Sequence, residues 1–310
     1  MLKNRRIVIT GGAGFIGSNL ARSLCEENEV IVIDNLLTGR YENISDIADR
    51  IRFVREDVNN IDMLMSEFQS VDYVLHQAAL PSVQRSVEDP VTSNMNNIDG
   101  TLRVLVAARD CGVKKVVYAS SSSVYGDTPI LPKREDMKPN PKSPYAITKL
   151  AGEYYCRVFS EIYGLKTACL RYFNVFGPRQ DPNSQYAAVI PLFITRTLNR
   201  NPPIIFGDGL QTRDFTFVKD VVLANVLAIE SQAVGIFNIA CGRQITLNDL
   251  ADRIMEITGI QMKKVFDLPR KGDIKDSLAD ISYAKRMLGY EPRFDLNLGL
   301  KETITWFQKN

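Results

Sequence analysis

Hydrophobic and polar positions alternate along the first half of the chain in the rhythm of a strand–helix repeat. Short runs rich in β-branched residues, typical of buried strands, are separated by amphipathic segments of helix length. The predicted strands are Arg6–Thr10, Glu29–Asp34, Ile51–Arg55, Val71–Gln77, Lys115–Ser120 and Lys166–Arg171. Repeated units of this kind build a parallel sheet with helices on both faces. We therefore expect an α/β fold, a doubly wound parallel sheet whose ligands gather at the carboxyl ends of the strands.

After about residue 175 the pattern changes, because prolines break the chain and strand-like runs become shorter. The breaks fall at Pro178, Pro182, Pro191, Pro202 and Pro203. We predict a first domain over 1–175 and a smaller α/β lobe over 176–310. Helices are predicted at Val218–Ile229, Thr246–Thr258 and Tyr283–Leu288, and a strand at Gly235–Ala240. Residues from about 210 to 240 are expected to return to the main sheet, so that the two lobes interleave.

The composition narrows the class of protein. Apolar residues make up 45% of the chain and charged residues 24%, as in ordinary globular proteins. Lysine and arginine number 38 against 36 aspartates and glutamates, without long runs of like charge, so nucleic acid and anionic membranes are not expected partners. The five cysteines include no C-x-x-C pair, which indicates neither a disulfide framework nor a metal site. With no leader-like start and no apolar run of about 18 residues, we expect a soluble cytoplasmic protein.

A glycine-rich turn follows the first predicted strand. Gly11, Gly14 and Gly17 form a G-x-x-G-x-x-G pattern that leads into a helix beginning near Phe15. Gly11 would allow the tight turn, Gly14 the close approach of a pyrophosphate, and Gly17 the close packing of helix and sheet. Free N–H groups at the helix start, at Phe15 and Ile16, would bind phosphate. This Rossmann-type motif predicts a bound dinucleotide.

Strand ends supply the remaining expected cofactor contacts. Asp34 ends the second strand, about 20 residues after the glycine turn, where a carboxylate can accept both ribose hydroxyls and repel a 2′-phosphate. NAD is therefore favoured over NADP, although Arg40 lies close in sequence. The other predicted contacts are Asn35, Asp57, Val58, Ala78 and Ala79. Asp57 could equally be a turn residue, and the single histidine, His76, is expected to be structural.

Three polar residues near the fifth strand point to redox chemistry on an alcohol. Ser121 lies in a serine run at the strand end, and Tyr145 and Lys149 are one turn apart on one face of the next helix. A tyrosine titrates near pH 10, so it acts as a base at neutral pH only when positive charge stabilises its phenolate. Lys149 and an oxidised nicotinamide would both supply that charge. Ser121 could hold the substrate oxygen while Tyr145 removes its proton and NAD takes the hydride.

Together these motifs resemble the extended short-chain dehydrogenase/reductases, from Arg6 to about Trp306, and within them the nucleotide-sugar 4-epimerases. The segments that carry the resemblance are His76–Ala79, Asn97–Thr101, Arg171–Pro178, Gly207–Gly209, Arg213–Phe215 and Arg270–Asp273. The resemblance implies that Asn97 and Tyr172 contribute to the NAD site and that Ser122 assists Ser121 in catalysis. It implies contacts to a UDP-sugar from Asn174, Ala188, Val189, Arg213, Arg270, Asp273 and Ser277.

The same resemblance favours epimerisation at C4 through a transient 4-keto sugar. Dehydratases of the family carry Asp-Glu after the catalytic Thr, whereas this chain has Ser122 and Ser123, which cannot protonate a departing hydroxyl. Ser277 falls where epimerases of N-acetyl sugars have a small residue and those restricted to UDP-glucose and UDP-galactose have a tyrosine. Pro81 stands where the N-acetylhexosamine enzymes often have glycine. UDP-GlcNAc/UDP-GalNAc and UDP-Glc/UDP-Gal therefore both stay open as substrates.

Two other functions also stay open. A UDP-uronic acid epimerase or decarboxylase would share the catalytic trio but would need a further basic residue facing C6, which the sequence does not single out. A non-catalytic NAD-binding regulator would need neither Tyr145 nor Lys149. The helices expected at Thr101–Cys111 and Tyr145–Phe159 resemble those that pair in dimers of the family, which implies a homodimer.

Overall fold

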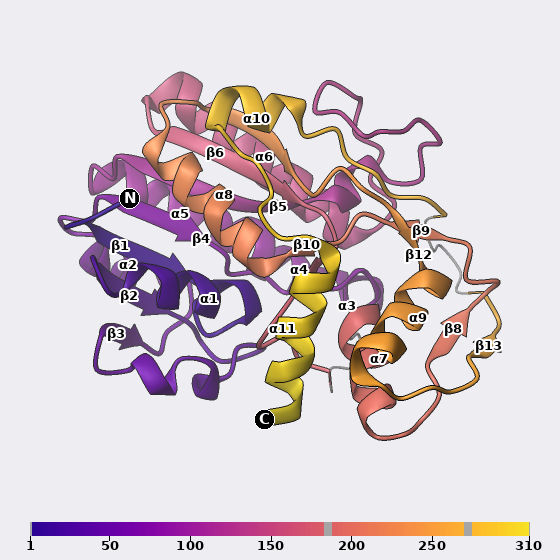
Figure 1. Cartoon of the computed structure of the whole chain (residues 1–310). Coiled ribbons are helices and arrows are strands. Elements are labelled where there is room, and N and C mark those ends of the chain that lie inside the picture. The colour runs from indigo at the N-terminus through magenta and orange to yellow at the C-terminus, as the bar shows by residue number, and fades with distance from the viewer. Residues whose placement is uncertain (1, 183–187, 270–274, 310) are drawn as a thin grey trace.

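The computed structural model describes residues 2–182, 188–269 and 275–309, and a seven-stranded sheet runs through its larger part (Figure 1). The strands are β1 (Arg6–Thr10), β2 (Glu29–Ile33), β3 (Ile51–Val54), β4 (Tyr73–His76), β5 (Lys115–Ser121), β6 (Lys166–Tyr172) and β11 (Gly235–Ile239). Their order is β11-β6-β5-β4-β1-β2-β3, and each neighbouring pair is parallel. The order changes direction between β1 and β4. This topology confirms the expected Rossmann-type, doubly wound α/β fold.

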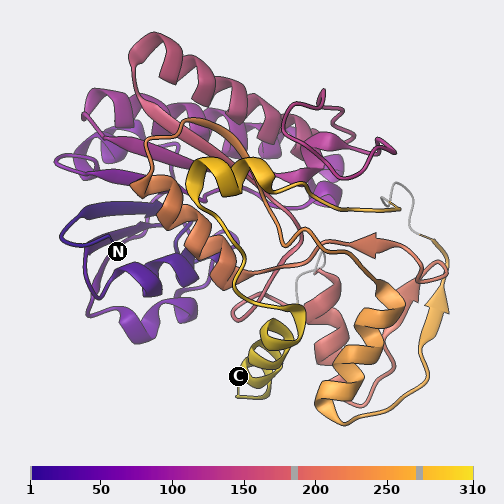
Figure 2. The same ribbon diagram turned by 45° about the horizontal axis from the view of Figure 1, so that its top comes forward.

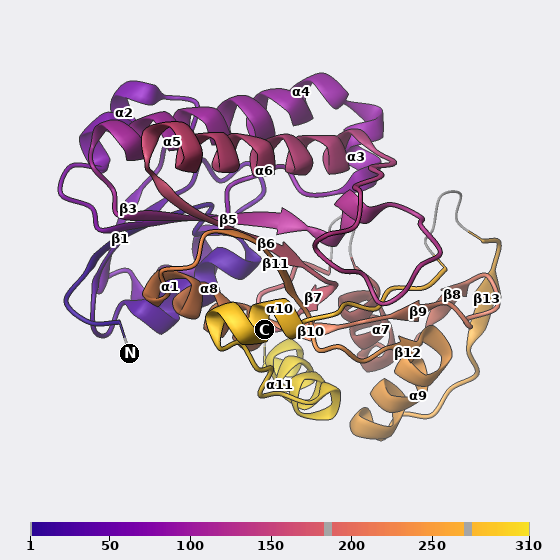
Figure 3. The same ribbon diagram turned by 90° about the horizontal axis from the view of Figure 1, so that it is seen from above.

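Helices cover both faces of the sheet, as Figure 3 shows. One face carries α2 (Ile61–Glu67), α5 (Gly100–Asp110) and α6 (Pro144–Tyr163); the other carries α1 (Phe15–Leu24), α8 (Val218–Glu230) and α10 (Ser282–Leu288). Successive residues of β1 point to opposite faces, so Ile7 and Ile9 join the core under α1 and α8, while Val8 joins the core under α5 and α6. Burial on both faces explains the continuous apolar runs of these strands.

The strand predictions are confirmed, with differences of one or two residues at some ends. The strand predicted over Glu29–Asp34 stops at Ile33, because the Asp34 side chain turns to accept backbone N–H groups of the neighbouring loops. The strand predicted from Val71 begins at Tyr73, because Val71 still closes the turn after α2 by donating to Phe68. Both differences arise from hydrogen bonds of adjoining turns.

The second lobe consists of short strand pairs and three longer helices. Its strands are β7 (Val175–Phe176) with β10 (Thr216–Phe217), β8 (Ile204–Phe206) with β13 (Val265–Asp267), and β9 (Thr212–Arg213) with β12 (Ile245–Thr246). Its helices are α7 (Val189–Leu198), α9 (Leu247–Thr258) and α11 (Leu296–Lys309). Phe193, Ile254 and Leu300 share its hydrophobic core. Figures 1 and 2 show α11 between α8 and α9.

Between these pieces the chain returns to the large sheet. The predicted helix Val218–Ile229 is α8, and the predicted strand Gly235–Ala240 is β11, which pairs with β6 at the sheet edge. The predicted helices Thr246–Thr258 and Tyr283–Leu288 correspond to α9, capped by Thr246, and α10. Shorter elements are α3 (Val83–Glu88), α4 (Pro90–Asn94), a π-helical turn at Met95–Asp99 and 3₁₀ turns at Tyr41–Asn43, Ser45–Ile47 and Ser122–Tyr125. In the described ranges, we find no helix with the length and apolarity needed to cross a membrane.

Candidate active site

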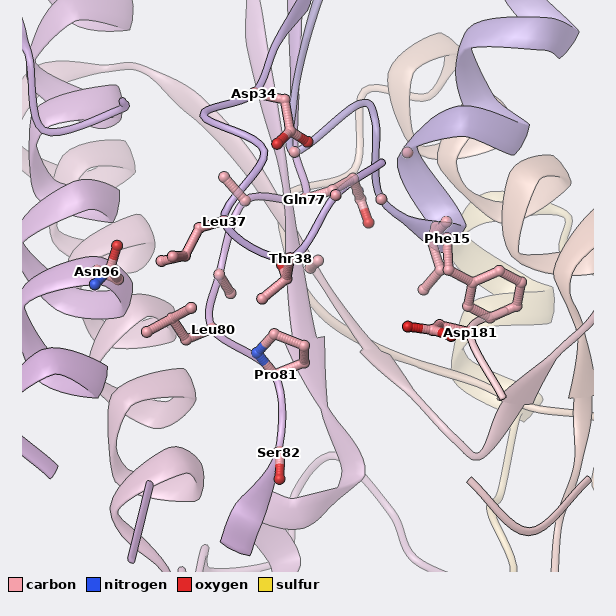
Figure 4. A pocket seen from close by; sticks show the side chains of 18 of the residues that line it. Phe15, Asp34, Leu37, Thr38, Gln77, Leu80, Pro81, Ser82, Asn96 and Asp181 are labelled. Atoms are coloured by element: carbon pink, nitrogen blue, oxygen red, sulfur yellow. The ribbon is translucent and has the colours of Figure 1, made fainter. Parts of the chain in front are cut away.

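A cleft of about 690 Å³ lies at the carboxyl ends of the central strands and is lined by residues of both lobes. It collects most of the cofactor residues predicted from sequence: Gly11, Gly14, Phe15, Ile16, Gly17, Asp34, Asn35, Asp57, Val58, Ala78, Ala79, Tyr145, Lys149 and Tyr172. Figure 4 shows part of the cleft, with Asp34, Leu37 and Thr38 from one lobe and Asp181 entering beside Phe15. The cleft lies beside the switch point between β1 and β4, where ligands bind in open α/β sheets.

Two glycines of this turn, Gly11 and Gly17, leave no space for a side chain. Gly11 has φ +69°, and a Cβ there would lie 2.6 Å from the backbone N of Ala78. A Cβ on Gly17 would lie 2.2 Å from the Gly11 carbonyl oxygen, so helix α1 could not pack as it does. Gly14 precedes the first turn of α1, with φ −76°. The exposed N–H groups of that turn form a cradle of the right kind for a phosphate.

The Asp34 carboxylate organises the loops beside this cradle. Its Oδ2 accepts from the N–H of Ala13 at 2.9 Å and its Oδ1 from the N–H of Leu36 at 2.8 Å. Burial raises the pKa of Asp34, and these two backbone hydrogen bonds oppose the rise. Each oxygen keeps a further lone pair for a ribose hydroxyl. Asn35 donates to Asp57 at 2.7 Å, which brings these two expected cofactor contacts together.

Two other residues near the cleft are held inside the protein. Asn97 is buried and is not part of the cleft lining; its amide contacts both backbone groups of Leu80 and donates to Thr148 at 3.0 Å. Its direct contact with NAD stays a prediction. His76 is buried between the hydroxyls of Thr10 (2.7 Å) and Thr101 (2.9 Å), and burial lowers its pKa to about 3. This burial and these two hydroxyl partners fit the structural role expected for His76.

Helix α6 presents Tyr145 and Lys149 to the cleft. Ser143 caps the helix by accepting from the N–H of Ala146 at 3.2 Å, and Pro144 occupies the first turn. Tyr145 thus lies in the first turn and Lys149 one turn later on the same face. The Lys149 Nζ atom donates to the Ala119 carbonyl at 2.8 Å. This bond fixes the ammonium group at the end of β5.

The electrostatic state of the pair follows from its burial. Burial lowers the pKa of Lys149 to about 8. Burial raises the pKa of Tyr145, and the hydrogen bond between Tyr145 and Ser121 opposes the rise. The tyrosine is therefore a neutral phenol at neutral pH until further positive charge enters the site. An oxidised nicotinamide would bring such a charge.

Ser121 ends β5 directly beside Tyr172, its register partner on β6. Its Oγ accepts from the N–H of Ser123 at 3.2 Å, which starts the 3₁₀ turn that also contains Ser122. No acidic side chain stands at 122 or 123, where a dehydratase would need its acid pair. The strand end offers hydroxyl groups alone at these positions.

A buried polar network lies beneath this strand end and was not foreseen from the sequence. Ser120 donates to Glu153 at 2.5 Å, and Arg171 pairs with the same carboxylate through two hydrogen bonds of 2.8 and 2.7 Å. The three residues are at most 3% exposed. Glu153 lies one turn after Lys149 on α6, and that spacing was the only sequence signal for it. The network ties the helix of the tyrosine to the strand of the serine.

The expected sugar-nucleotide residues are only partly brought together. Asn174 donates to the Asp214 carbonyl at 3.0 Å and to Ser277 at 3.4 Å, and Arg213, next to Asp214, donates to the carbonyl of Thr212 at 2.8 Å. Ala188 lines the cleft at the start of α7, followed by Val189. Arg270 and Asp273 lie outside the described residues. Asn174, Ser277, Arg213 and Val189 do not line the cleft itself.

The structure adds cleft residues that the sequence analysis did not select. They are Thr38, Gly39, Arg40, Asn43, Arg85, Asn96, Arg179, Gln180, Asp181, Pro182 and Trp306, among others. Those at 38–40 lie in the loop that follows Asp34, so their place near the end of β2 could have been inferred. Trp306 belongs to the last helix, and nothing in its sequence neighbourhood indicated a ligand site.

The glycine turn, the Asp34 carboxylate and the pair Tyr145 and Lys149 fit an NAD molecule and an alcohol substrate. They define a Rossmann-type nucleotide site of the short-chain dehydrogenase/reductase class. Residues 7–240 match the model of the NAD dependent epimerase/dehydratase family. The chain belongs to this family, which confirms the family expected from the sequence.

Relatives along the whole chain include sugar-nucleotide epimerases. A UDP-glucose 4-epimerase of Mycolicibacterium smegmatis is 40% identical, covering 98% of each chain. The solved UDP-N-acetylglucosamine 4-epimerase of Methanobrevibacter ruminantium, in complex with UDP-N-acetylmuramic acid, is 43% identical, with a TM-score of 0.97 and 99% of each chain covered. The UDP-glucuronic acid 4-epimerase of Bacillus cereus, solved with UDP-glucuronic acid and NAD, is 35% identical, with a TM-score of 0.91 and coverage of 98% and 99%.

Proposed function

We propose that this chain is an NAD-dependent UDP-sugar 4-epimerase. The observation that carries the proposal is the position of Tyr145 and Lys149 in the lining of a cleft with a dinucleotide cradle, with Ser121 hydrogen-bonded to Tyr145 and no acid pair beside the serine. This arrangement can oxidise a hydroxyl but lacks the acid that a dehydratase uses. Relatives at 40% and 43% identity named as 4-epimerases support the same reaction.

The residues divide the work as follows. Tyr145, once ionised, would take the O4 proton of the sugar, and Ser121 would hold O4 by a hydrogen bond. Lys149 would stabilise the phenolate through its charge at the end of β5. A bound NAD would supply reversible hydride transfer at C4. Gly14, Phe15 and Ile16 would hold its diphosphate.

The sugar nucleotide is proposed to be anchored by the second lobe. Asn174 contacts Ser277, and the segment 275–277 is hydrogen-bonded to Thr212, next to Arg213. Arg270 and Asp273 are included in the proposal from the sequence alone. A fixed diphosphate would let the sugar rotate while the nucleotide stays in place. Ser277 is small, which supports room for an acetamido group. UDP-GlcNAc/UDP-GalNAc and UDP-Glc/UDP-Gal are both proposed substrates.

The test is product analysis with the purified protein and separate UDP-GlcNAc, UDP-Glc and UDP-glucuronate. Conversion of one of the first two to its C4 epimer is expected. Exclusive conversion of UDP-glucuronate would favour the uronic acid alternative, which the Bacillus cereus relative at 35% identity supports. NAD binding without conversion of any sugar would leave the regulator alternative and end the epimerase proposal.

We also propose that the chain acts as a homodimer in the cytoplasm. Apolar side chains are exposed on the helices that the resemblance pairs and on their neighbours: Val87 62%, Val91 68%, Met95 53% and Ile147 53%. A second copy would cover them. Light scattering should give twice the mass of one chain, and the V91E variant should give a mass closer to that of the monomer. A monomeric wild type contradicts the dimer proposal.

The cytoplasmic location is a separate proposal, and cell fractionation tests it.

A further inference from the structure

An ion pair connects the second lobe to the first lobe at the cofactor cleft. Asp181 lies in the segment that follows β7, and Arg40 in the segment that follows β2. The Arg40 Nη2 atom donates to Asp181 Oδ2 at 2.8 Å, and the side chains are 51% and 34% exposed. Both residues line the cleft. Figure 4 shows Asp181 entering from the side of Phe15, across the cleft from Thr38.

The backbone that carries Arg40 packs around the carboxylate of Asp34, the residue expected to bind the ribose. A Cβ on Gly39, the preceding residue, would lie 2.8 Å from both oxygens of Asp34. The N–H of Arg40 donates to the Ala13 carbonyl at 3.0 Å, and the N–H of Ala13 donates to Asp34 at 2.9 Å. Because this backbone packs against Asp34 and Ala13, a guanidinium attached here would be able to turn toward the 2′ position of a ribose bound by Asp34. An arginine in such a place is how Rossmann sites accommodate the 2′-phosphate of NADP.

We propose that Asp181 is a cofactor-specificity residue, which keeps Arg40 from binding the 2′-phosphate of NADP by holding its guanidinium across the cleft. The carboxylate occupies one donor of the planar fork that would otherwise match phosphate oxygens. It also neutralises the charge of Arg40, so the negative charge of Asp34 is not offset. The inference rests on the proposed NAD function and extends cofactor choice to a residue of the second lobe.

The experiment measures direct binding of NAD and of NADP to the full chain by calorimetry, without sugar. D181N frees Arg40 and should raise the affinity for NADP relative to NAD by roughly fivefold, because a partly exposed ion pair contributes modestly. R40A breaks the same pair without freeing a cation, and its NADP affinity should not rise. The double variant R40A/D181N should match R40A.

A matched control is D252N, which removes a carboxylate that pairs with Lys264 at 2.8 Å outside the cleft lining. Its NADP-to-NAD affinity ratio should equal that of the wild type. An unchanged ratio in D181N, or an equal rise in R40A/D181N, overturns the inference. Failure of the wild type to bind NAD would instead count against the proposed function.

Discussion

The Nζ atom of Lys149 lies 5.9 Å from the centre of the Tyr145 ring, held there by the carbonyl of Ala119. At this distance the lysine acts on the phenol through its charge, because its donated hydrogen bond is directed at the backbone of β5. The proposed base therefore depends on an ammonium group that the Ala119 carbonyl of β5 holds in position.

Replacing Tyr145 with phenylalanine should lower the rate of epimerisation by about 10²–10⁴-fold or more, because the O4 proton loses its acceptor. NAD affinity should stay near the wild-type value, since the ring and the helix remain. Turnover and NAD binding are measured side by side. Y154F, at an exposed tyrosine of the same helix, is the matched control. Near-normal turnover in Y145F would show that another group is the base.

The pH dependence should report Lys149. Its pKa is lowered to about 8, so its charge is present below that pH and is lost as the pH rises through it. A positively charged nicotinamide nearby would favour the neutral amine further. We therefore expect kcat/KM to fall as the pH rises through about 8, or through a lower value when the nicotinamide is bound. The phenolate of Tyr145 then loses the positive charge of Lys149 that stabilises it. K149R, whose guanidinium stays charged, should lack this descending limb even if its rate is lower. An identical limb in K149R would assign it to another group.

Two glycines of the cradle should separate folding from cofactor binding. An added Cβ on Gly17 would lie 2.2 Å from a backbone oxygen, whereas one on Gly14 would lie 3.2 Å from the Gly11 oxygen. G17A should therefore lower the melting temperature and NAD affinity together. G14A should fold with a near-normal melting temperature but bind NAD at least about tenfold more weakly, because its Cβ occupies the approach of the diphosphate. Equal NAD affinity in G14A and wild type would place the diphosphate elsewhere.

The buried network under Ser121 should be costly to break. E153Q leaves the guanidinium of Arg171 without its carboxylate and should reduce the free energy of unfolding by about 3–5 kcal/mol, because an unpaired buried charge remains. D136N, at an exposed pair with Arg134, should cost at most about 1 kcal/mol. Urea unfolding measures both. A loss in E153Q no larger than that in D136N would mean that the network is not a stabilising unit.

Much of the main sheet was predictable because its strands are buried on both faces and stand out as continuous apolar runs. The glycine turn and Asp34 were predictable for a related reason, since local backbone geometry ties them to strand ends. The return of β11 was also foreseen. The short strand pairs of the second lobe were not predicted, because pairs of two residues, such as β7 with β10, leave no periodic signal in sequence.

The cleft shows a similar division. Tyr145 and Lys149 share a helix face, so their spacing alone placed them together. Arg40 and Asp181 meet although 141 residues separate them, and only the packing of the lobes decides that contact. Glu153 and Arg171 belong to different elements, and their pairing depends on the register of α6 against β6. Contacts of this kind are set by tertiary structure, and the pattern of residues along the sequence does not predict them.

The path of the chain through β11 restricts how the protein can be recombined. Because β11 belongs to the large sheet and α8 packs on it, while elements before and after them build the second lobe, that lobe is not one continuous stretch of sequence. A chimera that exchanges the second lobe with that of a relative must move at least two separate stretches of sequence. It must also preserve the edge pairing of β11 with β6, or the first half loses its outermost strand.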